Sequence, residues 1–224
     1  MTEPAKNERR NTLSILESDN VLNLCGIKTP KSVVVRNLAE AEKFAAAQRW
    51  PVVLKISSAG MMHKTEQGGV IINIDNPVKL SEAWKKINQI VSKFPKNFSC
   101  SINIQKQIPA GAEVIVGVKY DDSFGNVLMV GSGGILAELV ADNRLKLLPV
   151  NEKGASELLE QTKIYSLLKG FRGKKPYALK KLLGLIVKLS ALAEANPGFR
   201  EITINPVIVN EKEAVAADTR IILL

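Results

Sequence analysis

The stretch that decides the fold is PVVLKISSAGMMHKTEQGGVIINI, residues 51–74. It begins with an apolar run interrupted only by Lys55 and ends with a second, mainly apolar run from Val70 to Ile74, so the pattern predicts two strands. The loop between them, about 57–67, is longer than most loops of compact domains, and loops of that length are usually functional. It holds His63, the single histidine of the chain, which is therefore the first candidate for chemistry.

The composition of the 224 residues, 46% hydrophobic and 24% charged, is typical of a globular protein with a sizeable core. The first residues, MTEPAKNERRN, lack the apolar segment of a secretory signal, and the chain has no apolar run long enough for a transmembrane helix. The two cysteines, Cys25 and Cys100, do not have zinc-site spacing. We therefore expect a cytoplasmic protein with reduced thiols.

The net charge of +9 leaves three interpretations open. Much of the excess falls between residues 163 and 188, at Lys163, Lys169, Arg172, Lys174, Lys175, Lys180, Lys181 and Lys188. This run suits a solvated helix face, a surface for anions or a partner subunit, or a nucleic-acid site. Aromatic residues make up only 5% of the chain and do not interleave with the basic run, which disfavours nucleic acid.

The order of the predicted elements indicates an α/β (α+β) protein with two lobes, residues 11–100 and 101–224, after a flexible arm, residues 1–10. Asn11 is the expected cap of a first helix, and strand and helix then alternate to a helix that begins at Asn76-Pro77. Strands at 101–107, 113–119 and 126–130, joined by short turns, predict an antiparallel sheet. A strand at 135–140, a long helix at about 176–195 and a hairpin, 201–209 with 214–222, complete the second lobe.

The closing hairpin makes a geometric prediction. If Glu211 and Lys212 form a two-residue loop, the register places Asn205 directly opposite Asp218 on the neighbouring strand. Residues that are directly opposite share one face of the sheet, with Cβ atoms about 4.5–5.5 Å apart. An amide oxygen and a carboxylate that converge in this way suit Mg²⁺, which needs few protein ligands when phosphates and water complete its shell. The alternative is a polar strand edge that faces solvent.

Several other residues allow a functional and a plain interpretation. Lys55 is either a phosphate ligand or a solvated strand lysine, and the run Gly131-Ser132-Gly133-Gly134 is either a phosphate-binding loop or a tight turn. His63 can be a base, a metal ligand, a nucleophile toward phosphorus or a surface residue.

Five segments in this order resemble the ATP-grasp β subunit of ADP-forming acyl-CoA synthetases and, more distantly, the succinyl-CoA synthetase β subunit. They are LKISSAGMMHKTEQGGV, GAEVIVG, VGSGG, YSLLKGFRG and ITINP…AADTRI, and the resemblance covers about residues 10–222. It implies an ATP-grasp fold whose two lobes hold ATP or ADP with Mg²⁺. It also implies a CoA-binding α subunit as partner, in an α2β2 heterotetramer.

The resemblance also assigns roles to individual residues. His63 matches a histidine that accepts a phosphoryl group in relay with a histidine of the α subunit, and Lys55 matches a lysine that contacts the phosphates. Asn205 and Asp218 match the Mg²⁺ ligands. The remaining nucleotide-binding matches are Gln105, Lys106, Gln107, Ile108 and Glu113.

The chain departs from this family at two positions, where Thr203 and Lys106 replace residues that are usually or frequently acidic. Thr203 lowers the negative charge beside the metal ligands. Besides a β subunit that passes phosphoryl groups through His63, this departure keeps open a second hypothesis: a regulatory ATP-binding subunit without catalysis.

Overall fold

The computed structural model describes residues 11–57, 68–95, 100–134, 142–171, 173 and 175–224. The chain forms two compact units. The smaller unit is Pro30–Gln107, and the larger unit combines Met1–Thr29 with Ile108–Leu224. Within the described ranges, no helix has both the length and the apolar character needed to cross a membrane.

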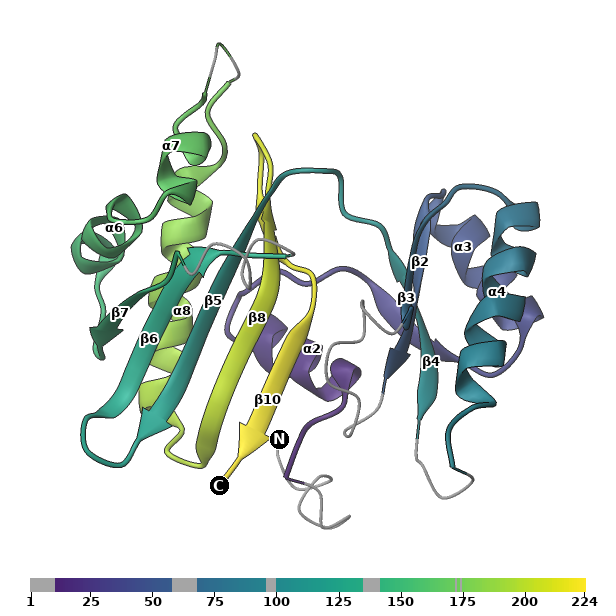
Figure 1. Ribbon diagram of the computed structural model, residues 1–224, viewed down its shortest axis with the longest axis horizontal. Helices are drawn as coiled ribbons and strands as arrows, with labels where there is room; N and C mark the ends of the chain where they lie inside the picture. Colours follow the sequence, from purple (N-terminus) through teal and green to yellow (C-terminus); the bar gives the residue numbers. More distant parts are fainter. Residues whose placement is uncertain (1–10, 58–67, 96–99, 135–141, 172, 174) are drawn as a thin grey trace. The chain divides into compact units, whose positions relative to one another are not determined.

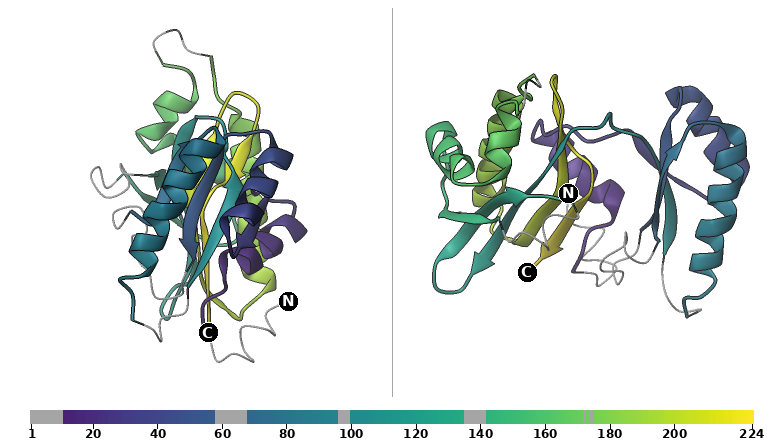
Figure 2. Two further views of the ribbon diagram at one scale, coloured as in Figure 1. Left: turned by 90° about the vertical axis from the view of Figure 1, so that its right-hand side faces the viewer. Right: turned by 45° about the horizontal axis from the view of Figure 1, so that its top comes forward.

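The smaller unit is a four-stranded antiparallel sheet with two helices on one face (Figures 1 and 2). The strand order is β1 (Ser32–Val35), β4 (Ser101–Lys106), β2 (Val52–Ser57) and β3 (Val70–Ile74). Helices α3 (Leu38–Gln48) and α4 (Pro77–Val91) bury their apolar sides against alternate residues of the strands. The remaining alternate residues of β2 and β4 therefore belong to the sheet face away from these helices.

Both helices of the smaller unit begin at the asparagine that the sequence indicates. Asn37 accepts a hydrogen bond from the Glu40 N–H, and Asn76 accepts one from the Lys79 N–H. Pro77 occupies the first turn of α4, where the missing N–H costs nothing. These caps fix where each helix leaves the sheet.

The larger unit is a six-stranded antiparallel sheet with its helices on one face (Figure 1). Its main strand order is β10 (Thr219–Leu223), β8 (Phe199–Val209), β5 (Ala112–Asp121), β6 (Gly125–Ser132) and β7 (Arg144–Leu147), and β9 (Ala214–Ala216) also pairs with β8. The helices are α2 (Ile15–Leu24), α6 (Glu152–Glu160), α7 (Ile164–Leu168) and α8 (Leu179–Ala195). Their apolar residues and those of the covered sheet face form one core.

The structure corrects the predicted lobe boundary and part of the predicted strand pairing. The strand at 101–106 does not pair with β5; it lies between β1 and β2, so the first unit extends to Gln107. Helix α2 packs on β10 and therefore belongs to the larger unit. Both errors have one cause, because strand pairing and helix docking depend on residues far away in the chain. The β5–β6 hairpin and the closing hairpin form as expected.

Two smaller predictions are also corrected, and two lie outside the described residues. Helix α2 is capped by Ser14, not Asn11, because Ser14 and Glu17 form a reciprocal capping box. Helix α8 begins at Leu179 rather than near residue 176. The predicted arm, residues 1–10, and the predicted strand, 135–140, fall outside the described ranges.

Candidate functional site

The closing hairpin brings Asn205 and Asp218 together in the predicted register. The Asn205 N–H donates to the Asp218 carbonyl oxygen at 3.0 Å, between the paired segments of β8 with β9 and β8 with β10. The turn fixes this register, because the Asn210 side chain accepts from the N–H groups of Lys212 and Glu213 at 2.9 and 3.0 Å. The predicted opposition of an amide and a carboxylate is therefore confirmed.

These side chains belong to the sheet face away from the helices. Ile202 and Ile204 are almost fully buried in the core, so Thr203 and Asn205, which alternate with them, belong to the opposite face. The Thr203 hydroxyl donates to Glu201 Oε1 at 2.9 Å, which ties two neighbours of this face together.

The glycine run ends beside Asn205 and Glu113. The Gly134 N–H donates to Asn205 Oδ1 at 2.9 Å, and the Gly133 N–H donates to the Glu113 carbonyl oxygen at 2.8 Å. A Cβ added to Gly134 would overlap Glu113 Oε2, so the Glu113 carboxylate lies directly against Gly134. Three separately predicted features, the glycine run, Glu113 and Asn205, are therefore one cluster.

Close packing explains why this run is rich in glycine. A Cβ at Gly131 would lie 2.6 Å from the Asp142 carbonyl oxygen, and one at Gly133 would lie 2.6 Å from the Val114 carbonyl carbon. Gly134 has a φ of +60°, which favours glycine. The N–H groups of Gly133 and Gly134 are both hydrogen-bonded within the unit, as in a tight turn.

Asp142 is a site neighbour that sequence reasoning missed. Its carboxylate is almost fully buried and accepts from the Ser132 hydroxyl at 2.8 Å. It also accepts from the N–H groups of Lys163 and Ile164, at 2.8 and 3.2 Å to Oδ2. Burial raises the pKa of Asp142, but the hydrogen bonds from Lys163, Ser132 and Ile164 outweigh burial and hold that pKa below its usual range. Asp142 is therefore an anion at neutral pH.

In the smaller unit, Lys55 and Gln105 share the sheet face away from the helices. Lys55 pairs across the strands with Asn103, and Gln105 pairs with Val53. The side chains are buried, with 5% exposure for Lys55 and Gln105 and 3% for Asn103. A buried ammonium requires polar or anionic neighbours, which agrees with a role toward phosphates.

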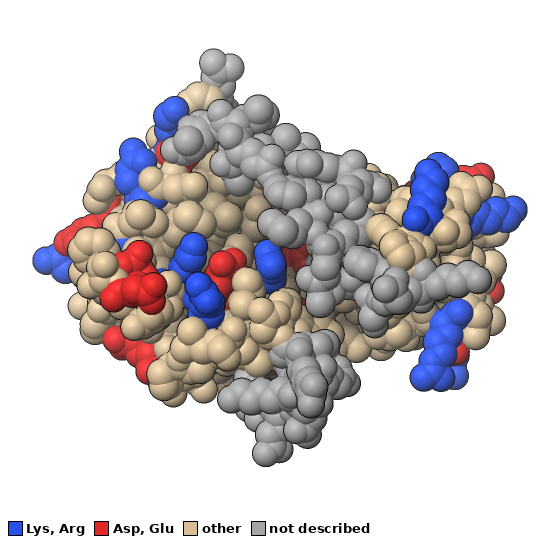
Figure 3. All heavy atoms as spheres, turned by 60° about the horizontal axis from the view of Figure 1, so that its bottom comes forward, with Lys and Arg blue, Asp and Glu red and all other residues tan. Residues whose placement is uncertain are grey.

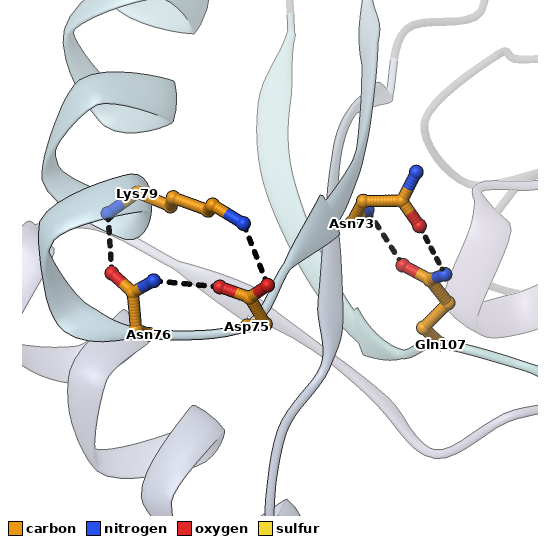
Figure 4. Close-up of polar contacts among 5 residues, drawn as sticks. All are labelled: Asn73, Asp75, Asn76, Lys79 and Gln107. Carbon is orange, nitrogen blue, oxygen red and sulfur yellow. Dashed lines mark hydrogen bonds and ion pairs between the residues drawn. The ribbon is translucent and has the colours of Figure 1, made fainter.

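Lys106 and Gln107 make hydrogen bonds within the smaller unit and just beyond its last strand. Lys106 Nζ donates to the carbonyl oxygens of Arg49 and Trp50, at 3.2 and 2.7 Å, just beyond the end of α3. Figure 4 shows the Gln107 amide in a two-bond contact with Asn73, at 2.7 and 2.8 Å. Asn73 has a φ of +61°, so this contact holds a left-handed backbone position of β3.

The other predicted residues divide between the larger unit and the undescribed ranges. Ile108 is buried and begins the second segment of the larger unit. His63 lies outside the described residues. In the described part of the chain, no three His, Cys, Asp or Glu side chains gather to form a metal site. The amide–carboxylate pair of Asn205 and Asp218 supplies hard oxygen donors, which fit Mg²⁺.

The basic excess does not gather on the face shown in Figure 3. There, the described acidic and basic side chains of the larger unit lie interspersed. Within the basic run, Lys188 donates to the Gly26 carbonyl oxygen at 2.7 Å and Lys169 lies 4.7 Å from the centre of the Tyr165 ring. These two lysines therefore have neighbours within the larger unit.

A family model for the ATP-grasp domain matches residues 4–223. The chain belongs to the ATP-grasp family. Within this family it is 39% identical to the β subunit of the ADP-forming acetate–CoA ligase I of Pyrococcus furiosus, over 99% of this chain and 95% of the relative. It is 38% identical to the ADP-forming 4-hydroxybutyrate–CoA ligase of Nitrosopumilus maritimus, covering 92% of this chain and 30% of that longer protein.

Solved structures are also similar to this chain. Acetyl-coenzyme A synthetase 1 of Candidatus Korarchaeum cryptofilum, solved with coenzyme A and Ca-AMPCP, matches with a TM-score of 0.93 and 30% identity, over 99% of this chain and 97% of that one. Another structure of that enzyme, with a TM-score of 0.84 and 30% identity over the same shares, contains Mg-AMPPCP and a phosphohistidine segment pointing towards the nucleotide-binding site. The predicted ATP-grasp fold and the family resemblance are therefore confirmed.

Proposed function

We propose that this chain is the nucleotide-binding β subunit of an ADP-forming acyl-CoA ligase, with acetate as the first acid to test. The observation that carries the proposal is the 39% identity to an acetate–CoA ligase β subunit along nearly the full length of both chains. The reaction is acyl-CoA + ADP + phosphate ⇌ acid + CoA + ATP. The share of this subunit is phosphoryl transfer between the nucleotide and a partner α subunit, which binds CoA.

In this proposal each predicted site residue has its own role. Lys55 neutralises phosphate charge, while Gln105 and Glu113 contact the nucleotide. Asn205 and Asp218 hold Mg²⁺, which supplies charge neutralisation at the phosphates when it is bound. In the ATP-consuming direction, the neutral imidazole of His63 attacks the γ-phosphorus, a bond from phosphorus to nitrogen forms, and the bond to the ADP oxygen breaks.

The proposal extends to the assembly and its location. The α subunit completes the reaction, and we propose an α2β2 assembly in the cytoplasm. Cys25 and Cys100 are free thiols, which agrees with a reducing compartment.

The test is phosphoryl labelling with ATP that carries a radioactive γ-phosphate and Mg²⁺. Wild type and His63→Ala are compared, each with and without the α subunit, and the bond is tested for acid lability and base stability. We expect label on the wild-type chain and none on the variant, which should still bind ADP. Equal labelling of both chains would refute the role of His63.

A second candidate function, a regulatory subunit without transfer, derives from Thr203. At this position a neutral residue replaces an acidic residue of the family pattern, and its hydroxyl donates a hydrogen bond to Glu201. The relatives disfavour this candidate, because they are named as ligases or ligase subunits. It would gain support if the wild-type complex bound ATP without labelling and Thr203→Asp restored the label.

A further inference from the structure

Asp142 is a buried anion to which the proposed transfer gives no role. It is 2% exposed, and its main hydroxyl partner, Ser132, is 4% exposed. Hydrogen bonds to a charged group in such surroundings are stronger than those between neutral groups. The Ser132–Asp142 bond therefore strongly constrains the end of β6.

The same carboxylate fixes the start of α7. Lys163, at the N-cap of this helix, makes no side-chain capping bond. Instead, the N–H groups of Lys163 and Ile164 donate hydrogen bonds to the carboxylate of Asp142, which lies 21 and 22 residues before them in the chain. It thus replaces a local cap and complements the positive end of the helix.

From Ser132 the constraint continues along the backbone. The next two residues, Gly133 and Gly134, donate to the Glu113 carbonyl oxygen and to Asn205 Oδ1. On the other side, Gly131 packs so closely on Asp142 and Asn143 that a Cβ would overlap Asn143 Oδ1. The glycine run therefore has one end held by Asp142 and the other end in contact with two predicted ligand-binding side chains.

We propose that Asp142 is a positioning residue for the nucleotide and metal ligands: by holding Ser132 and the start of α7, it fixes the glycine run against Glu113 and Asn205. This inference rests on the proposed function, since it assumes that Glu113 contacts the nucleotide and Asn205 the metal. The proposal gives Asp142 no contact of its own with the nucleotide or the metal.

The test measures binding of ADP with Mg²⁺ to the full chain by titration calorimetry, for wild type, Ser132→Ala, Asp142→Asn and the double variant. Ser156→Ala is the matched control, since the Ser156 hydroxyl also donates to a carboxylate, Glu160 Oε1 at 3.0 Å, but on the surface of α6. We expect Kd to rise about three- to tenfold in Ser132→Ala and Asp142→Asn, and to stay within about twofold in the control.

Two features of the data separate positioning from a purely structural effect. A partly unfolded variant lowers the number of binding sites and leaves the Kd of the folded molecules unchanged, whereas displaced ligands raise Kd at full occupancy. The Mg²⁺ concentration for half-maximal ADP binding should rise in parallel. Ser132→Ala removes only the bond to Asp142, which Asp142→Asn also weakens, so the double variant should bind ADP about as weakly as Asp142→Asn alone.

The outcomes are decisive in both directions. Unchanged Kd in Ser132→Ala, with wild type binding ADP, overturns the positioning role while the proposed function stands; this holds even if Asp142→Asn does not fold. Additive losses would also contradict it, because they would mean that the two residues act separately. A wild-type chain that does not bind ADP overturns the proposed function and this inference together.

Discussion

Replacing Gly134 by alanine should separate the stability of the larger unit from its nucleotide affinity. Gly134 has a φ of +60°, and its Cα faces the Glu113 carboxylate. A methyl group there would overlap Glu113 Oε2 and lie 2.9 Å from Glu113 Cδ, whereas ordinary contacts begin at 3.4 Å. The obstacle is the far end of an exposed side chain, so Glu113 can turn away while the backbone remains in place.

The expected losses of folding stability and of ADP affinity have different causes and sizes. For stability, the left-handed backbone costs alanine about 1–2 kcal/mol, and an off-rotamer Glu113 costs about 0.5–1.5 kcal/mol. For affinity, a displaced Glu113 would lose the hydrogen bond that we propose it makes to the nucleotide, and bonds to charged groups contribute about 1.5–3 kcal/mol. That loss corresponds to a Kd for ADP about 10- to 150-fold higher.

Urea unfolding and calorimetric ADP binding measure the two quantities, and two glycines serve as controls. Gly125 has a φ of +74° with nothing within 4 Å of an added Cβ, so Gly125→Ala carries the backbone cost alone. Gly133→Ala meets backbone atoms of Val114 and Ile115 within 2.9 Å, which cannot turn away, and should prevent stable folding of the unit. If Gly134→Ala binds ADP as tightly as Gly125→Ala, Glu113 does not contact the nucleotide and the reasoning fails.

Three further substitutions test other parts of the structure. Gly184 lies inside α8 with nothing within 4 Å of an added Cβ, so Gly184→Ala should stabilise the protein by about 0.5–1 kcal/mol in urea unfolding; a loss would reveal a contact that the structure does not show. The folded pKa of Asp142 lies below its unfolded value, so its contribution is present above about pH 4 and is lost as pH falls through the folded pKa. Asp142→Asn should therefore destabilise the protein most near neutral pH, and a gap to wild type that widens in acid would contradict this sign. Lys106→Met removes two hydrogen bonds at the end of α3 and should cost about 1 kcal/mol of stability, while Kd for ADP stays within about twofold; a larger loss of affinity would mean that the ammonium serves the nucleotide.

The closing hairpin shows what the sequence can predict. Its register follows from a two-residue loop, and the loop follows from Asn210, whose side chain accepts from the two N–H groups of the turn. All of this information lies within 14 residues, so local chemistry determines which side chains oppose each other. For this reason the sequence alone predicts that Asn205 lies opposite Asp218.

The lobe boundary could not be predicted in the same way. The residues of β4 alternate as any strand does, and the turn after it resembles the connection of a hairpin. Whether β4 pairs with β5 or inserts between β1 and β2 depends on strands whose residues lie about 45–75 positions earlier. Asp142 was missed for the same reason, because Asp142-Asn143 is a plain turn signal and its partners are 10 and 21 residues away.

The charges around the glycine run bear on the proposed metal site. The N–H groups of Gly133 and Gly134 are already hydrogen-bonded, and among the described residues the side chains at Gly134 include Glu113, which is acidic, and Asn205, which is neutral. Phosphates carry negative charge, so they approach such a cluster favourably only when a cation lies between. This charge balance supports the proposed Mg²⁺ site at this end of the sheet. Thr203 agrees with this charge balance. Its hydroxyl donates a hydrogen bond to Glu201, whereas a carboxylate at position 203 would repel Glu201 and increase the negative charge near the proposed metal.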